Sequence, residues 1–259
     1  MTTNIFYFSG TGNSLKVAID IAEELGNTGI IPIPTILKKE IDLSCDCIGI
    51  VFPVYMWGAP YIVKDFITKI STEKYVFAVV TYGVVSGGTL LQVKKLLKKQ
   101  NTKLCAGFKI NMPDNAIMLY DAFPLEKQNR MFHNEREKIK RISCVIKERE
   151  IGHIERDFFL INWFTTGFLH KIFSKRIPGS DKSFWTDEKC NRCNTCSKIC
   201  PLSNIIMVNG HPEWLHKCQL CMCCIQWCPK EAIQYKDKSI HRKRNRNPYV
   251  KITDFIFKP

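Results

Sequence analysis

Eight of the thirteen cysteines form two copies of one spacing, and this pattern constrains the fold more than any other feature of the sequence. Each copy reads Cys-x-x-Cys-x-x-Cys-x-x-x-Cys-Pro. Three cysteines two residues apart can wrap a short loop around one cubane iron–sulfur cluster, and the fourth is carried away on a turn that the proline marks. The pattern predicts two 4Fe-4S clusters with the ligands Cys190, Cys193, Cys196, Cys200, Cys218, Cys221, Cys224 and Cys228.

A zinc site is the alternative, because zinc ribbons also contain paired Cys-x-x-Cys motifs. A zinc ion needs only four ligands, which gives no reason for a third cysteine at the same step or for the repeated Cys-Pro. Iron is therefore the favoured metal. Cys223 lies outside the repeated spacing and is expected to be a small buried side chain.

The spacing resembles the cysteine run of bacterial-type ferredoxins that hold two clusters. The resemblance implies that the fourth cysteine of each run binds the cluster of the other run. The first three cysteines of the first run would then share a cluster with Cys228, and those of the second run would share one with Cys200. Because this exchange ties the two halves together, neither half is expected to fold well without iron.

A phosphate-binding loop is predicted at the first strand–helix turn. The apolar run Ile5–Phe8 is followed by six polar or glycine residues and then by a helical pattern that Gly26 closes. Amides of such a loop and of the helix N-terminus point at an anion, and hydroxyl groups add donors. The loop lacks both the Gly-Lys-Ser and the Gly-x-Gly-x-x-Gly patterns, so neither nucleotide hydrolysis nor a dinucleotide fold is indicated. A polar turn that caps the helix is the alternative. The predicted phosphate-binding residues are Ser9, Gly10, Thr11, Gly12, Asn13 and Ser14.

This loop resembles the pattern with which flavodoxins hold the phosphate of FMN. In flavodoxin-like proteins two further loops lie against the flavin ring, and the corresponding loops here are 53–60 and 82–88. Both follow the carboxyl end of a strand, where open α/β sheets bind ligands. The resemblance implies that Trp57, or alternatively Tyr55, stacks on one face of the ring and Tyr82 on the other, while glycines admit a flat ligand. Aromatic packing beneath the loops is the competing interpretation. The expected ring-side residues are Trp57, Gly58, Tyr82, Gly83, Gly87 and Gly88.

Five apolar strands alternate with helices in the first part of the chain. We expect these strands at 5–8, 29–33, 45–52, 75–81 and 103–112. The alternation predicts an α/β fold, a flavodoxin-like doubly wound five-stranded parallel sheet, followed by a small α+β bacterial-type ferredoxin domain. The expected parts are an FMN-binding domain at 1–150, an apolar helical linker at 151–180, and a two-cluster ferredoxin domain with a basic C-terminal tail at 181–259.

Residues 158–173 are crowded with aromatic and aliphatic side chains. The uncharged part, 158–169, is too short for a transmembrane helix, which needs about twenty residues. We expect a helix packed between the two domains. Contact with a membrane surface, helped by Lys171, Lys175 and Arg176, is the alternative.

The formal net charge is +14. Two clusters with their thiolates lower this by about four charges and an FMN phosphate by about two more, which leaves a basic protein. No nucleic-acid module is recognisable, so we expect an acidic redox partner, such as an acidic ferredoxin, and no nucleic acid. The basic run 236–246 is expected to be solvated, and docking of that partner is the alternative. Many cysteines without an export signal favour a reducing, cytoplasmic location, in keeping with an anaerobe.

The whole chain resembles fusion proteins of anaerobic bacteria and archaea that join a flavodoxin-like domain to a bacterial-type ferredoxin domain. The resemblance implies FMN, two 4Fe-4S clusters, electron transfer with an external redox protein and a possible homodimer. The alternative is an FMN-dependent oxidoreductase that reduces a small acceptor with electrons from its own clusters. No histidine lies in either flavin loop, so we assign no catalytic residue. A third possibility is a regulatory protein that uses its clusters as a sensor, but the sequence contains no recognisable effector domain to support it.

Overall fold

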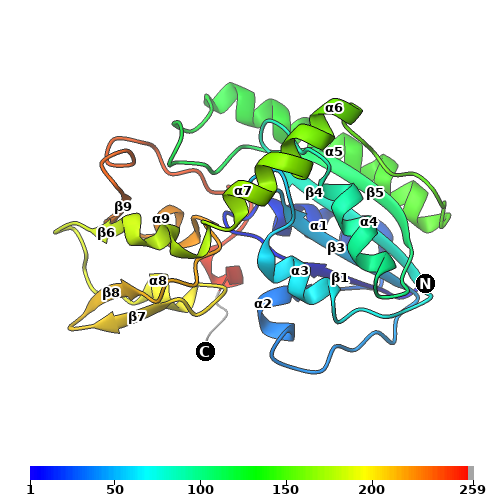
Figure 1. Cartoon of the computed structure of the whole chain (residues 1–259), viewed down its shortest axis with the longest axis horizontal. Helices are drawn as coiled ribbons and strands as arrows, with labels where there is room; N and C mark the ends of the chain where they lie inside the picture. The colour runs from blue at the N-terminus through cyan, green and yellow to red at the C-terminus, as the bar shows by residue number, and fades with distance from the viewer. Residues whose placement is uncertain (256–259) are drawn as a thin grey trace.

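The N-terminal part of the protein is built around one parallel sheet (Figure 1). The computed structural model describes residues 1–255. The strand order β2-β1-β3-β4-β5 is the flavodoxin-like doubly wound order predicted from the sequence, and each expected strand end lies within two residues of the observed one. The strands are β1 (Thr3–Tyr7), β2 (Thr28–Pro32), β3 (Cys47–Pro53), β4 (Tyr75–Tyr82) and β5 (Leu104–Asn111).

Helices cover both faces of this sheet. On one face α1 packs against α5, and on the other α3 lies beside α4 (Figure 1). Every residue from Cys47 to Phe52 is buried, which explains the nearly continuous apolar run of that strand. The helices are α1 (Asn13–Leu25), α2 (Ile33–Ile36), α3 (Tyr61–Ile67), α4 (Thr89–Lys98) and α5 (Leu125–Lys147).

After α5 the chain returns to the edge of the sheet and then forms a long helix. The amide of Gly107 in β5 donates to the carbonyl of His153 (2.8 Å). The helix consists of α6 (Phe159–Asn162), the π-helical η1 (Trp163–Leu169) and α7 (His170–Ser174) without a break. It was expected to pack between the domains, but most of its apolar side chains are exposed. Within residues 1–255, no helix has both the length and the apolar character to cross a bilayer.

The cysteine-rich part is small and contains two antiparallel pairs of strands, β6 with β9 and β7 with β8. Two short helices, α8 and α9, contact each other, and each lies within one cysteine run. The elements are η2 (Pro178–Ser183), β6 (Phe184–Thr186), α8 (Thr195–Lys198), β7 (Ile205–Val208), β8 (His211–Trp214), α9 (Cys223–Gln226), β9 (Ile233–Tyr235) and η3 (Ile252–Phe255).

The cysteine-rich part shares an apolar cluster with the parallel sheet, although most of its buried apolar side chains form a second cluster. Ile199, Cys223 and Trp227 are buried in the same cluster as the side chains of the parallel sheet. The indole Nε1 of Trp227 donates to the carbonyl of Gly10 in the loop after β1 (3.0 Å). The cysteine-rich part is therefore packed directly on the carboxyl end of the sheet.

Candidate functional site

The predicted phosphate-binding loop lies between β1 and α1. Gly12 has a φ of 101°, a left-handed conformation that favours glycine, and it turns the chain into α1. Its amide donates to Ser9 Oγ (3.1 Å), while the buried hydroxyls of Ser14 and Thr81 lie 2.8 Å apart. The first turn of α1 carries no acidic side chain that would oppose an anion. Five of the six predicted residues line a cavity at this helix end: Ser9, Gly10, Thr11, Asn13 and Ser14.

A larger cavity continues from the phosphate end across the carboxyl ends of β3 and β4. Its empty volume is about 1060 Å³. Tyr55, Tyr82 and Gly83 line both cavities, and Trp57 lines the larger one. Hydroxyl donors at one end and aromatic walls at the other provide the chemistry needed by a phosphate joined to a flat ring.

A third loop, 112–120, forms a wall of the cavity that the sequence analysis missed. Asp114, Asn115 and Tyr120 from this loop line the larger cavity. Burial raises the pKa of the Tyr120 phenol, and a hydrogen bond with Asp114 adds to this effect. The loop follows β5, so the rule that ligands bind at carboxyl ends of parallel strands could have identified it.

Several predicted glycines lie outside the cavity lining. A Cβ on Gly58 would lie within 2.4 Å of the His170 ring, and Gly87 and Gly88 face Thr166. The absence of side chains at these positions admits the long helix 159–174, and their contact with a ligand stays a prediction. Of the predicted ring-side residues, the structure therefore brings Trp57, Tyr82 and Gly83 to the cavity.

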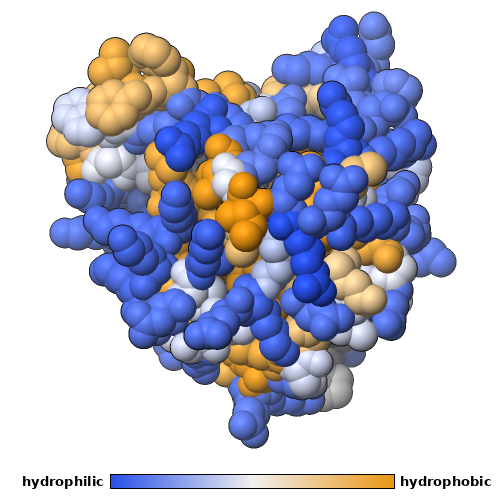
Figure 2. Space-filling view, turned by 90° about the vertical axis from the view of Figure 1, so that its right-hand side faces the viewer, coloured by the Kyte–Doolittle hydropathy of each residue, from blue (hydrophilic) through white to orange (hydrophobic). Residues whose placement is uncertain are grey.

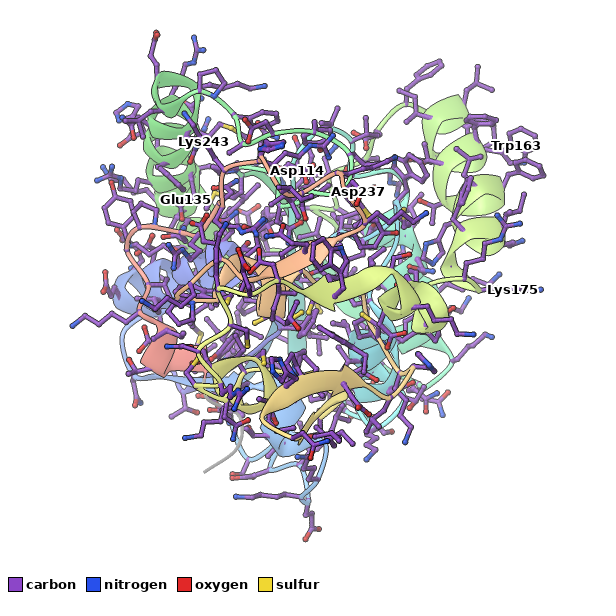
Figure 3. All side chains as sticks on the ribbon, turned by 90° about the vertical axis from the view of Figure 1, so that its left-hand side faces the viewer. Asp114, Glu135, Trp163, Lys175, Asp237 and Lys243 are labelled. Carbon is purple, nitrogen blue, oxygen red and sulfur yellow. The ribbon has the colours of Figure 1, made fainter. Side chains whose placement is uncertain are left out.

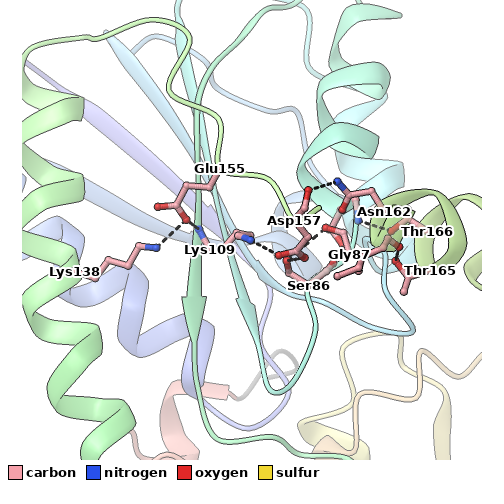
Figure 4. A network of polar contacts seen from close by, with 12 residues as sticks. Ser86, Gly87, Lys109, Lys138, Glu155, Asp157, Asn162, Thr165 and Thr166 are labelled. Atoms are coloured by element: carbon pink, nitrogen blue, oxygen red, sulfur yellow. Dashed lines mark hydrogen bonds and ion pairs between the residues drawn. The ribbon is translucent and has the colours of Figure 1, made fainter. Parts of the chain in front are cut away.

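A network of charged side chains fixes the 82–88 loop beside the cavity (Figure 4). Asp157 accepts hydrogen bonds from Ser86 Oγ (2.6 Å) and Lys109 Nζ (2.5 Å). Burial alone would raise the pKa of Asp157, but the hydrogen bonds from Lys109 and Ser86 outweigh it and hold the pKa below its usual value. Glu155 extends the network by accepting from the Lys109 amide and from Lys138 Nζ, both at 2.8 Å. The carboxylates of Asp157 and Glu155 thus attach the 82–88 loop and the segment that precedes α6 to β5.

The eight cysteines of the repeated spacing border two separate cavities. Each cavity combines the first three cysteines of one run with the fourth of the other, which is the exchange implied by the resemblance to ferredoxins. Their empty volumes are about 310 and 360 Å³. We name the first set the outer cysteine group: Cys190, Cys193, Cys196 and Cys228. We name the second set the inner cysteine group: Cys200, Cys218, Cys221 and Cys224.

The backbone around each group has the form of an anion-binding nest. Arg192 (φ 61°) and Asn194 (φ 62°) flank a cysteine of the outer group, and Leu220 (φ 55°) and Met222 (φ 60°) flank the equivalent cysteine of the inner group. Such conformations are uncommon for residues other than glycine. Alternation with right-handed residues points successive amides to one side, as at many iron–sulfur sites. The equivalent pairs therefore fit clusters held in both groups.

The spacing of the cysteine side chains can be compared with that of a zinc site. Thiolates around one zinc ion lie roughly 3.8 Å apart, given a Zn–S bond of about 2.3 Å. In the described part of the chain, no three His, Cys, Asp or Glu side chains converge closely enough to hold a single ion. Burial raises the pKa of Cys196 and of Cys218 to about 12, and a metal bound there would have to displace their protons.

The inner cysteine group adjoins the larger cavity. Asn115 Nδ2 donates to the carbonyl of Cys221 (3.3 Å), and a Cβ on Gly10 would lie 2.3 Å from the same oxygen. Leu220 lines the larger cavity directly. Cys193 of the outer group is exposed. The large cavity, the inner group and the outer group therefore lie in series from the sheet to the surface.

Comparisons with known proteins concern mainly the part of the chain that forms the parallel sheet. Residues 4–110 match the family model of the flavodoxin domain. This part of the chain is a flavodoxin-like domain. The protein is also 36% identical over 70 residues to an uncharacterized polyferredoxin-like protein of Methanocaldococcus jannaschii. That match covers 27% of this chain and 31% of the relative, so the chain spans less than a third of the relative's length.

Solved flavodoxin structures resemble the protein at low identity. A Fusobacterium nucleatum flavodoxin bound to flavin mononucleotide is 16% identical, with a TM-score of 0.40, over 57% of this chain and 98% of that one. Flavodoxin 2 of Bacillus cereus is 16% identical, with a TM-score of 0.43, over 57% of this chain and 99% of that one.

The basic run 236–246 returns from the cysteine-rich part to the flavodoxin-like domain. Arg242 Nη1 donates to the carbonyl of Ile117 (2.6 Å), and Arg244 Nη2 donates to the carbonyl of Ile233 (3.0 Å). These two arginines are half-buried, so part of the run has a structural role. Its exposed cations are Lys236, Lys238, Lys243 and Arg246.

Proposed function

We propose that the protein is an electron-transfer flavoprotein that holds FMN in the flavodoxin-like domain and two 4Fe-4S clusters in the cysteine groups. It exchanges electrons with an external redox protein. The observation that carries this proposal is the contact between the inner cysteine group and the larger cavity through Leu220 and Cys221.

The FMN phosphate would be held by the loop from Ser9 to Ser14, and the ring by the walls that carry Trp57 and Tyr82. Flavin accepts one electron or two, whereas four-iron clusters pass single electrons. Asp114 and Asn115 of the third loop would contact the flavin from the side that also touches the inner group. This loop is therefore placed to tune the flavin and to fix its distance from the inner cysteines.

The two cysteine groups differ in their access to solvent. Cys221 and Cys224 of the inner group are buried, whereas Cys193 of the outer group is exposed. The inner group therefore lies deeper than the outer group, which reaches the surface at Cys193. This difference supports the outer group as the point where electrons enter or leave the protein.

The first test is a cofactor analysis of protein prepared without oxygen. About eight irons with matching acid-labile sulfide and one FMN per chain are expected. A stepwise reductive titration, followed by absorbance and electron paramagnetic resonance, should then reduce clusters and flavin in the same preparation. Zinc without sulfide would overturn the cluster assignment, and iron without flavin would overturn the assignment of the 9–14 loop.

Paired cysteine variants test which cysteines share a cluster. Replacing Cys200 and Cys218 together by Ala removes two ligands of the inner group, so about four irons should remain. Replacing Cys190 and Cys200 together damages both groups, so both clusters should be lost. If the Cys190 and Cys200 variant instead kept about four irons and the Cys200 and Cys218 variant lost both clusters, each run would bind its own cluster. Cys223→Ala is the matched control, because this buried cysteine lies within the second cysteine run but outside the repeated spacing.

The larger cavity favours a second candidate, an FMN-dependent oxidoreductase that reduces a small acceptor. The cavity is open to solvent and has Asp114 and Tyr120 in its wall, and the Tyr120 hydroxyl, whose pKa burial raises, could hold a proton for an acceptor. A screen of small acceptors with the reduced protein distinguishes the two functions. Turnover that Tyr120→Phe lowers while cluster-to-flavin transfer is unchanged would favour the reductase.

A further inference from the structure

The helix 159–174 has its polar and apolar faces reversed. A surface helix usually buries its apolar stripe and exposes its polar face. The buried side chains of this helix are instead polar: Asn162, Thr165, His170 and Ser174. Nine large apolar side chains at this helix and just before it are exposed: Phe158, Phe159, Leu160, Ile161, Trp163, Phe164, Phe168, Ile172 and Phe173.

The polar face is held by the two loops that border the flavin cavity. Thr166 Oγ1 donates to the carbonyl of Trp57 (2.5 Å) and accepts from the amide of Gly88 (2.7 Å). The ring Nδ1 of His170 hydrogen-bonds to the carbonyl of Met56 (2.8 Å). The helix therefore cannot rotate its apolar side chains inward without breaking these bonds.

The exposed apolar face is larger than a soluble monomer usually shows. Its six aromatic side chains are between 40% and 73% exposed. They present roughly 700 Å² of surface if a fully exposed aromatic side chain offers about 200 Å², and the largest patch of a typical monomer is about 300–600 Å². Figure 2 shows apolar side chains gathered at one upper corner of the protein, and in Figure 3 Trp163 and Lys175 point outward from the helix.

We propose that this helix binds the surface of an anionic lipid bilayer. The stretch 158–180 contains no aspartate or glutamate, and its exposed cations Lys171, Lys175 and Arg176 lie towards the C-terminal end of the aromatic stretch. Aromatic residues that enter the headgroup region beside cations that attract anionic lipids are the composition of helices lying in the membrane interface. The polar inner face remains attached to the flavin loops, so binding would hold the flavodoxin-like domain against the membrane.

A second copy of the protein fits this face less well than lipid does. Parallel pairing of two such helices would bring the cations at 171, 175 and 176 together, and antiparallel pairing would place them against aromatic side chains. Neither arrangement supplies a carboxylate from this stretch to pair with them. Anionic headgroups provide the missing negative charge.

The test is co-sedimentation of the oxygen-free holoprotein with vesicles of phosphatidylcholine, with and without phosphatidylglycerol. Binding should require phosphatidylglycerol and weaken as salt rises. The double variant Phe159→Ser, Trp163→Ser should bind at least about tenfold more weakly because both side chains leave the interface. The triple variant Lys171→Ser, Lys175→Ser, Arg176→Ser should lose the preference for anionic lipid.

The matched control is Leu125→Ser, Ile151→Ser, because these side chains are 71% and 63% exposed elsewhere on the protein, against 73% and 62% for Phe159 and Trp163. The control should bind vesicles like the unaltered protein, with unchanged iron and flavin content in every variant. Lack of binding to either vesicle, or equal loss in the control, would overturn the proposal. A dimer that the Phe159 and Trp163 changes dissolve, without vesicle binding, would assign the face to a second copy instead.

Discussion

Replacing Glu135 by Gln should remove most of a pH dependence of stability that the contact between α1 and α5 creates. Glu135 in α5 is 3% exposed and lies beside Asp20 of α1, which is 8% exposed and forms an ion pair with Lys16. Burial raises the pKa of Glu135 to about 8, and the negative charge of Asp20 contributes. Helix α1, which carries Asp20, begins at the phosphate-binding loop.

The sign and size follow from linkage. The folded-state pKa of Glu135 lies above its value of about 4.3 in an unfolded chain, so the folded protein binds a proton that the unfolded protein releases. This contribution is complete below about pH 4.3 and is lost as the pH rises towards 8. At about 1.4 kcal/mol per unit, the loss is on the order of 3–5 kcal/mol. For a chain of this size that corresponds to a Tm lowered by roughly 10 °C.

The assay is thermal unfolding of the oxygen-free holoprotein by circular dichroism between pH 5 and 9. Gln cannot ionise, so E135Q should be more stable than the unaltered protein at pH 9, and the difference should shrink towards pH 5. Glu137→Gln is the control, because Glu137 is exposed on the same helix and pairs with Lys140 (3.0 Å). If E135Q and the unaltered protein change in parallel across this range, Glu135 does not carry the effect.

Three further predictions concern electron transfer. Gly10→Ala should weaken FMN binding and slow cluster-to-flavin transfer, because the added Cβ would lie 2.3 Å from the Cys221 carbonyl oxygen. Flavin titration and stopped-flow reduction measure the two effects. Gly179→Ala is the control and should change neither, because its added Cβ would have no neighbour within 4 Å. Cluster-to-flavin transfer should be first order and independent of protein concentration, since both sites lie in one chain; a rate that grows with concentration would mean transfer between chains. Replacing the exposed cations of the basic run by Ser should slow electron uptake from an acidic ferredoxin and weaken the salt dependence of its rate. These cations are Lys236, Lys238, Lys243 and Arg246. Unchanged kinetics would show that they are not the docking site.

Local patterns in the sequence were sufficient to predict the parallel sheet. The strands are buried on both faces, so their apolar runs are visible without tertiary information, and the order of strands and helices follows from alternation. The phosphate loop is equally local, because a strand, a glycine-rich turn and a helix are consecutive in the chain.

The parts that could not be predicted depend on contacts distant in sequence. The approach of helix 159–174 explains Gly58, Gly87 and Gly88, which resemble ligand-binding glycines when the sequence alone is considered. The reversed faces of that helix also escape prediction, since composition shows that a stretch is apolar but not which side faces the protein. The pairing of cysteine runs came from a resemblance, and the fold adds the position of the inner group beside the larger cavity.

The route of the chain links the phosphate-binding loop to the cysteine-rich part. The segment after both cysteine runs returns to the phosphate-binding loop, where the Asn247 amide donates to the carbonyl of Thr11 (2.8 Å) and its Nδ2 donates to Asn13 Oδ1 (3.0 Å). A Cβ on Gly12 would lie 2.9 Å from Cβ of Asn247, so the loop and the returning segment fit only because this glycine has no side chain. The cysteine runs that precede this segment are expected to need metal to fold, and the position of the segment would then depend on that metal. Loss of iron should therefore loosen the phosphate loop as well, and flavin affinity becomes a property of the assembled cysteine groups and not of the flavodoxin-like domain alone.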